Sequence, residues 1–147
     1  MIDSNNHRAL IWNSFPTGNS APADVVIGQM DFDLNHPNDD DGNRVPDLTA
    51  SRRTLRNPAS GVHSNGVQLA ITDNNNHRVL IWNQFPSANF QPADRVLGQW
   101  NFVNRNANAG DEARSQTLSQ PTGVTFTPSG LAVTDTSNYR VLIFDSR

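Results

Sequence analysis

An internal repeat is the feature that most constrains how this chain can fold. Residues 3–32 recur as residues 73–102, and 19 of these 30 positions are identical. The first copy begins DSNNHRALIWNSFP and ends PADVVIGQMDF, whereas the second begins DNNNHRVLIWNQFP and ends PADRVLGQWNF. A third, incomplete copy starts at Pro121. The pattern predicts neighbouring copies of one structural unit, each of which buries its apolar faces against the next.

Composition excludes several classes of protein. The chain has no cysteine, so a disulfide framework, a zinc–thiolate site and a thiol nucleophile are excluded. Its net charge is −3 and all 11 basic residues are arginines, which disfavours nonspecific nucleic-acid binding. No apolar run approaches the length of a membrane span, and Met1 and Ile2 lead into the repeat without a signal peptide. We expect a soluble chain whose parent protein could be exported or displayed at the cell surface.

Each unit is predicted to contain four short strands, A to D. The segment GVHSNGVQL contains Asn65-Gly66, a strong two-residue hairpin signal, so strands A and B should form a hairpin. LAITD is then strand B, NNNHR a tight turn, and RVLIW strand C. Strand C is apolar at consecutive positions, which is typical of a strand covered on both faces. Trp12, Trp82 and Phe144 occupy equivalent positions of this strand and should pack between units.

Four antiparallel strands per unit, with each sheet between its neighbours, are typical of a β-propeller. The sequence D-x-x-N-H-R-[AV]-L-I-W resembles the NHL repeat, and the ending GQ-x-[DN]-F resembles bacterial NHL-repeat proteins. The resemblance implies an all-β propeller, six-bladed in a complete parent protein, of which this chain holds two to three blades. The first predicted segment, residues 1–57, is a partial blade with strands B to D and an insertion. The second, residues 58–120, is a complete blade with an insertion. The third, residues 121–147, is a partial blade with strands A to C.

One copy of the chain cannot close a ring, because propellers close with about four to eight blades. We expect a fragment of a longer propeller, and the alternative is that several copies assemble into a ring. Exposed blade edges would then allow self-association.

The turn D-x-x-N-[HY]-R recurs in all three copies, and we interpret it as structural. Tyr139 stands where the other copies have His7 and His77, and a phenol replaces an imidazole metal ligand poorly. Packing or capping therefore explains these rings better than metal binding, and we expect no metal or cofactor. The acids and amides should act as Asx-type turn residues, and each arginine should pair with an aspartate of the same or the adjacent blade. The motif residues are Asp3, Asn6, His7, Arg8, Asp73, Asn76, His77, Arg78, Asp135, Asn138, Tyr139 and Arg140.

Residues 38–43, NDDDGN, resemble a calcium-binding loop only superficially. If Gly42 takes the glycine position of such a loop, Pro37 and Leu48 fall where the acidic ligands belong. We expect a solvated acidic loop that is neutralised by Arg52, Arg53 and Arg56, with a phosphate clamp as the alternative role of these arginines.

The sequence favours a non-catalytic binding or scaffolding module. It lacks the G-x-S-x-G and H-E-x-x-H motifs, a glycine-rich phosphate loop and any lysine. Because some propellers with this resemblance are metal-dependent lactonases or lyases, the alternative is part of an enzymatic propeller.

The B–C turns, residues 4–7, 74–77 and 136–139, should share a face with the insertions, about residues 33–57 and 103–120. Variable loops on a rigid scaffold commonly carry recognition. We expect a protein or glycan ligand there and place the residues 87–90 on the opposite face. The candidate ligand residues are Asn74, Asn75, Arg52, Arg53 and Trp100.

Overall fold

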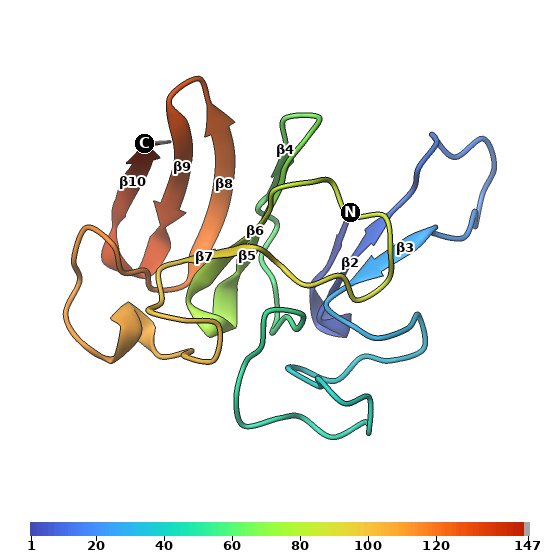
Figure 1. Cartoon of the computed structure of the whole chain (residues 1–147), viewed down its shortest axis with the longest axis horizontal. Helices are drawn as coiled ribbons and strands as arrows, with labels where there is room; N and C mark the ends of the chain where they lie inside the picture. Colours follow the sequence, from blue (N-terminus) through green and yellow to red (C-terminus); the bar gives the residue numbers. More distant parts are fainter. Residues whose placement is uncertain (146–147) are drawn as a thin grey trace.

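The computed structural model describes residues 1–145, and the last two residues of the third predicted segment, 146 and 147, lie outside it. Within residues 1–145 the chain forms ten β-strands and four short 3-10 turns, and no α-helix. The strands form three antiparallel sheets that lie side by side (Figure 1). The predicted all-β class is therefore confirmed.

The three sheets correspond to the three repeats. The first contains β1 (Ile2–Asp3), β2 (Arg8–Ile11) and β3 (Val25–Ile27). The second contains β4 (Val62–Ser64), β5 (Leu69–Asp73), β6 (Arg78–Trp82) and β7 (Arg95–Leu97). The third contains β8 (Pro121–Thr127), β9 (Gly130–Asp135) and β10 (Arg140–Asp145). The 3-10 turns are η1 (Ser4–Asn6), η2 (Asn74–Asn76), η3 (Ala107–Gly110) and η4 (Thr136–Asn138).

The predicted order of strands within each unit is confirmed, but one turn is longer than expected. Strands β4 and β5 pair as a hairpin whose loop holds four residues, 65–68, instead of two. Oδ1 of Asn65 accepts the backbone N–H groups of Val67 and Gln68 at 3.0 and 2.8 Å. This Asx-type bonding stabilises the wider loop, so Asn65-Gly66 forms only its first half.

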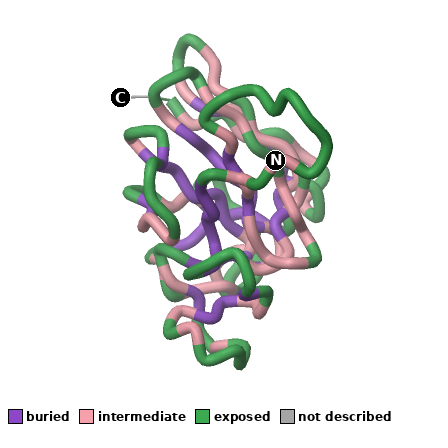
Figure 2. Tube along the Cα trace, turned by 90° about the vertical axis from the view of Figure 1, so that its right-hand side faces the viewer, coloured by how far each residue is buried: buried purple, intermediate pink, exposed green. Residues whose placement is uncertain are grey.

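The hydrophobic core lies in the two spaces between the three sheets. Strands β5 and β6 are buried along their whole length because they have a neighbouring sheet on each side. Leu80 and Trp82 pack toward the first sheet, whereas Val79 and Ile81 pack toward the third. Figure 2 shows the buried positions gathered in the middle of the molecule, with exposed loops around them. The prediction that strand C is covered on both faces is confirmed for the second unit.

The equivalent aromatic residues are not buried alike. Trp82 is fully buried, but Trp12 and Phe144 are only partly buried. Phe144 packs against the core between the second and third sheets. Trp12 follows β2 on the side away from the second sheet, where residues 1–145 place no further unit, so for this residue the packing between units stays a prediction.

The two insertions lie at the end of the sheets opposite the β4–β5 and β8–β9 hairpin tips (Figure 1). The loop between β6 and β7 does not stay on that opposite face as predicted. Asn89 and Phe90 instead bond to both backbone polar groups of Val26, at 3.0 and 2.9 Å, and so cover the outer edge of β3. Phe90 also lies beneath the guanidinium of Arg53, 5.8 Å from ring centroid to Cζ. The expected separation of residues 87–90 from the insertion is therefore wrong.

Across residues 1–145, no helix has the length and apolar character needed to cross a membrane.

Candidate functional site at the insertion loops

The site is built on the repeated turn, whose backbone is the same in all three units. A 3-10 turn follows strand β1, β5 or β9 and ends at a residue with positive φ: His7 at 55°, His77 at 54° and Tyr139 at 54°. The aspartate before each turn makes no side-chain capping bond to it. The predicted Asx-type bond within the turn is therefore wrong for the aspartates. The predicted bonding to backbone amides is confirmed for Asp73 and Asp135, but the amides belong to other segments.

Each aspartate forms an ion pair with the arginine of its own unit. Nε of Arg78 donates to Asp73 at 2.8 Å, and both side chains are fully buried. The same pair joins Arg8 to Asp3 and Arg140 to Asp135. The prediction of an Asp–Arg pair within one blade is thus confirmed.

The remaining donors of Arg78 bind the insertions. Its guanidinium donates to the backbone carbonyls of Ser51, Thr54 and Phe102. A buried charge is tolerated only when it is paired and hydrogen-bonded, and these bonds satisfy that requirement. The guanidinium of Arg78 therefore holds the last part of the first insertion and the residue that precedes the second insertion.

In Asp73 and Asp135, the second carboxylate oxygen accepts a backbone N–H from the end of the preceding insertion. Oδ1 of Asp73 accepts from Arg56 at 2.8 Å, and Oδ1 of Asp135 accepts from Ser119 at 2.7 Å. At Asp3, partial burial alone would raise the pKa, but hydrogen bonds from Asn6 and Arg8 outweigh it and hold the pKa below 3.8. The carboxylates of Asp73 and Asp135 thus join each turn to the insertion that precedes it.

The histidines also join successive units. Nδ1 of His7 accepts the N–H of Asn57 at 2.9 Å, and Nδ1 of His77 accepts that of Gln120 at 3.0 Å. Burial lowers the pKa of both histidines below 6.5, which favours the neutral ring that can accept these bonds. The capping role is confirmed for these two rings. Tyr139 is 97% exposed and has no following unit within residues 1–145, so its packing or capping role stays a prediction.

Two asparagine pairs, absent from the predicted motif contacts, clamp the insertions to the turns. Asn38 and Asn76 exchange two side-chain hydrogen bonds of 3.1 and 2.8 Å, and both residues are buried. Asn108 and Asn138 repeat this exchange in the next unit. These pairs could have been predicted from the sequence. Asn38 and Asn108 are separated by the same number of residues as the two copies of the repeat, although they lie beyond its most similar part.

Two glutamines were also missed as site-building residues. Nε2 of Gln29 donates to the carbonyls of His7 and His36 at 3.2 and 2.9 Å. Gln99 makes the equivalent bonds to His77 and Asn106 at 3.1 and 2.8 Å. These glutamines fix the start of each insertion, and the identical GQ pair of the two repeats is the signal that marks them.

The five predicted ligand residues do not form one cluster of free side chains. Asn74 donates its amide to the carbonyl of Pro121 at 3.1 Å, and the backbone N–H of Asn75 donates to Arg56. The side chain of Asn74 therefore serves the scaffold, whereas the bond at Asn75 uses only its backbone. Trp100 is 54% exposed and remains available for contact.

The arginines of the first insertion do not neutralise its acids, so that prediction is wrong. Arg52 donates to the carbonyl of Ala93 and lies over the ring of Phe102, 5.0 Å from its centroid. Arg53 lies over Phe90. Cation–π contacts and carbonyl bonds take the place of the expected ion pairs.

The acidic loop is only partly solvated. Carboxylate oxygens of Asp39, Asp41 and Asp47 lie within 4.8 Å of one another, but Asp39 is fully buried. Its two oxygens accept the backbone N–H groups of Asn43 and Arg44 at 3.1 and 3.0 Å. The expectation of a wholly solvated loop is wrong for Asp39, whose carboxylate shapes the loop from inside.

The insertions nevertheless expose large apolar side chains. Leu48 is 84% exposed and Val45 59% in the first insertion, and Val103 is 53% exposed in the second. Nε of Arg105 donates to the carbonyl of Leu48 at 2.7 Å, so the two insertions are in direct contact. Trp100 lies just before the second insertion, and we call Val45, Leu48, Trp100 and Val103 the insertion face.

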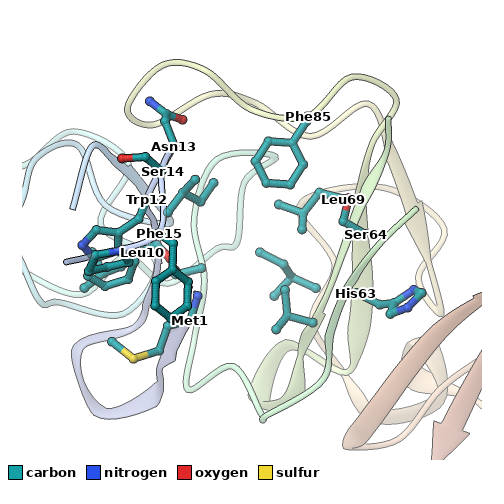
Figure 3. Close-up of a pocket in the computed structure, with 15 residues that line it drawn as sticks. Met1, Leu10, Trp12, Asn13, Ser14, Phe15, His63, Ser64, Leu69 and Phe85 are labelled. Carbon is teal, nitrogen blue, oxygen red and sulfur yellow. Dashed lines mark hydrogen bonds between the residues drawn. The ribbon is translucent and has the colours of Figure 1, made fainter. Parts of the chain in front are cut away.

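A separate cleft of about 440 Å³ lies between the first and second sheets. Its lining is largely apolar and includes Leu10, Trp12, Phe15 and Phe85 (Figure 3). His63 points away from this cleft, toward the third sheet, where its Nδ1 accepts the N–H of Phe126 at 3.0 Å. The cleft thus offers apolar contact, and His63 of β4 lines it while its ring is turned toward the third sheet.

Taken together, the rigid turns and exposed insertions can present an apolar surface to a partner. No protein-family model matches the chain, and no curated protein matches it.

Proposed function

We propose that the three sheets are blades of an NHL-type β-propeller and that the chain is a non-catalytic binding module. It recognises a protein through the insertion face. The side-by-side sheets, each an antiparallel meander, support the propeller architecture. The His–amide and Asn–Asn contacts support it further, because they join each unit to the next in the same way. The Asp–Arg pair recurs inside every unit.

The observation that carries the binding proposal is the exposure of the insertion face. Leu48 at 84%, Val45 at 59%, Trp100 at 54% and Val103 at 53% are large apolar residues on loops of a folded chain. Contiguous exposed apolar side chains mark interaction surfaces, and the bond from Arg105 to Leu48 brings the two insertions together. The loops are also held in place by buried asparagine, aspartate and arginine contacts, so little ordering entropy would oppose binding.

The chemistry of this face favours a protein over a glycan. Aliphatic leucine and valine side chains gain free energy by excluding water from an apolar partner surface. Trp100 can serve as the aromatic anchor of such an interface. The net charge of −3 also makes nucleic acid a poor partner.

The enzymatic alternative, a lactonase- or lyase-like propeller, has less support. Such a site needs histidine or acidic side chains free to reach a ligand. Nδ1 of His63, His7 and His77 each accepts a backbone N–H, and Asp39 is buried with its two oxygens bonded to the backbone. These groups hold the fold together.

Capture of partners from an extract of the source cells tests this function. The immobilised 147-residue chain is compared with the double variant Leu48→Ser/Trp100→Ser and with the control Val67→Ser. Val67 is 54% exposed on the β4–β5 loop, which makes it a match for Trp100 in exposure. The partner that the wild-type chain retains is identified and titrated against all three proteins.

We expect the double variant to weaken binding of that partner by more than about tenfold, or 1.4 kcal/mol, and the control to leave it unchanged. Equal binding by the double variant and the wild type would show that another surface carries recognition. Hydrolysis of a lactone by the purified chain would instead support the enzymatic alternative.

A further inference from the structure

The junctions between the sheets follow one rule. At the first junction, Ala9 and Ile11 of β2 meet the face of the second sheet that carries Leu80 and Trp82. At the second junction, the next unit repeats the arrangement. Val79 and Ile81 of β6 pack with the third sheet, including Phe144 and Leu142. We call the face of a sheet that packs on the following unit its leading face, and the face that packs on the preceding unit its trailing face. At both junctions the leading face of one sheet packs on the trailing face of the next.

The leading face of the third sheet has no cover within residues 1–145. Val141 and Ile143 occupy the positions of Val79 and Ile81, in an identical RVLI sequence. Val79 and Ile81 are 0% and 7% exposed, but Val141 and Ile143 are 61% and 58% exposed. Tyr139, 97% exposed, stands at the turn whose histidine counterparts contact the next unit.

The trailing face of the first sheet is uncovered as well. Leu10 and Trp12 occupy the positions of Leu80 and Trp82, on the side of β2 away from the second sheet. Met1, at the position of Ile71, is 67% exposed. The chain thus carries both halves of its own repeated junction, one at each end of the row of sheets.

We infer that the leading face of the third sheet binds the trailing face of the first sheet of a second copy, head to tail. Val141, Ile143 and Tyr139 of one copy meet Met1, Leu10 and Trp12 of the other. A second copy is the occupant because it presents the same side-chain types that cover the equivalent positions twice within the chain. Two different patches make this interface heterologous, so each copy keeps one free face and further copies can add. This inference does not depend on the insertion face or its partner.

Analytical ultracentrifugation of the purified 147-residue chain tests the inference. The mean mass is expected to rise with protein concentration through the micromolar range. Ile143→Asp should raise the dissociation constant more than about tenfold, because it places a charge in the interface. Val67→Asp is the matched control, since Val67 is 54% exposed but lies on the β4–β5 loop, and it should leave association unchanged.

Mixing distinguishes head-to-tail association from a symmetric dimer. Ile143→Asp blocks the leading face and Leu10→Asp blocks the trailing face, so each variant alone should be monomeric. Their equimolar mixture should form a 1:1 complex that grows no further, because each partner still has the complementary face. Far-ultraviolet circular dichroism checks the fold of both variants, and Leu10→Ser replaces Leu10→Asp if the latter unfolds.

Three results would overturn the inference. The wild-type chain could stay monomeric at high micromolar concentration. Ile143→Asp and Val67→Asp could lower association equally, which would indicate nonspecific contact. The mixture of blocked variants could stay monomeric while the wild type associates, which would assign self-association to another surface.

Discussion

Asn38 and Asn76 exchange two side-chain hydrogen bonds, so an insertion of the first unit is clamped to the turn of the second. Both residues are almost completely buried. Substituting Asn76→Ala leaves the amide of Asn38 with its donor and acceptor capacity largely unmet, at a cost of about 1–3 kcal/mol for each buried group. We expect urea unfolding to show a loss of about 2–4 kcal/mol.

Asn138→Ala gives the comparison, because the Asn108–Asn138 pair is only partly buried. Its loss of stability should be smaller, since water can replace the missing bonds. Equal losses for the two variants would show that burial does not control the strength of the clamp.

The buried ion pair predicts a graded response to arginine substitution. Arg78→Met leaves the fully buried carboxylate of Asp73 without its cation and frees three carbonyls of the insertions. We expect a loss of about 3–5 kcal/mol in the free energy of unfolding. Arg140→Met should cost less because that side chain is 28% exposed. A larger loss for Arg140→Met, measured in the same denaturant titration, would contradict this order.

Substitution of Gly98 tests how closely the chain at Leu118 packs against the end of strand β7. It has φ of +90°, and a Cβ there would lie 2.7 Å from the side chain of buried Leu118. Gly98→Ala therefore combines backbone strain with overpacking, and we expect a loss of about 2–4 kcal/mol. The control is Gly18→Ala, where nothing lies within 4 Å of the added Cβ and stability should change little. Similar melting temperatures for the two variants would contradict the prediction.

The histidine contacts make stability depend on pH. Burial lowers the pKa of His7 and His77 in the folded chain, so the unfolded chain binds more protons as pH falls. Their contribution is present above the ordinary histidine pKa of 6.5 and is lost as pH falls through the lower folded values. The free energy of unfolding should therefore decrease on acidification below neutral pH.

The double variant His7→Asn/His77→Asn isolates this effect. Asparagine tolerates the positive φ at these positions and offers an oxygen acceptor, but it does not titrate. Chemical unfolding over a pH series should show a weaker decrease for the variant than for the wild type. An unchanged pH dependence would mean that other groups control acid stability.

Much of the fold could be predicted from the sequence because its determinants are local. The repeat spacing, the runs of apolar residues and the polar turns defined the order of strands in each sheet. The Asp73–Arg78 pair was also predictable, because the residues are five positions apart at the ends of paired strands. Periodicity and short-range bonding need no knowledge of distant neighbours.

Much of the candidate site depended on contacts between distant parts of the chain. The imidazole of His7 accepts an N–H from Asn57, and Arg52 bonds to Ala93 instead of the nearby acids. Which of several possible partners such a group takes is decided by the packing of whole units, so residue type and spacing could not choose among them.

The identical RVLI segments separate what the sequence determined from what the tertiary structure decided. The sequence by itself made both segments strands, β6 and β10, with the same alternation of side chains. Only the tertiary structure decided that Val79 and Ile81 are buried while Val141 and Ile143 are more than half exposed. Local sequence sets the direction of a side chain along a strand. Burial depends on whether another sheet covers that side, and within residues 1–145 only the second sheet is covered on both.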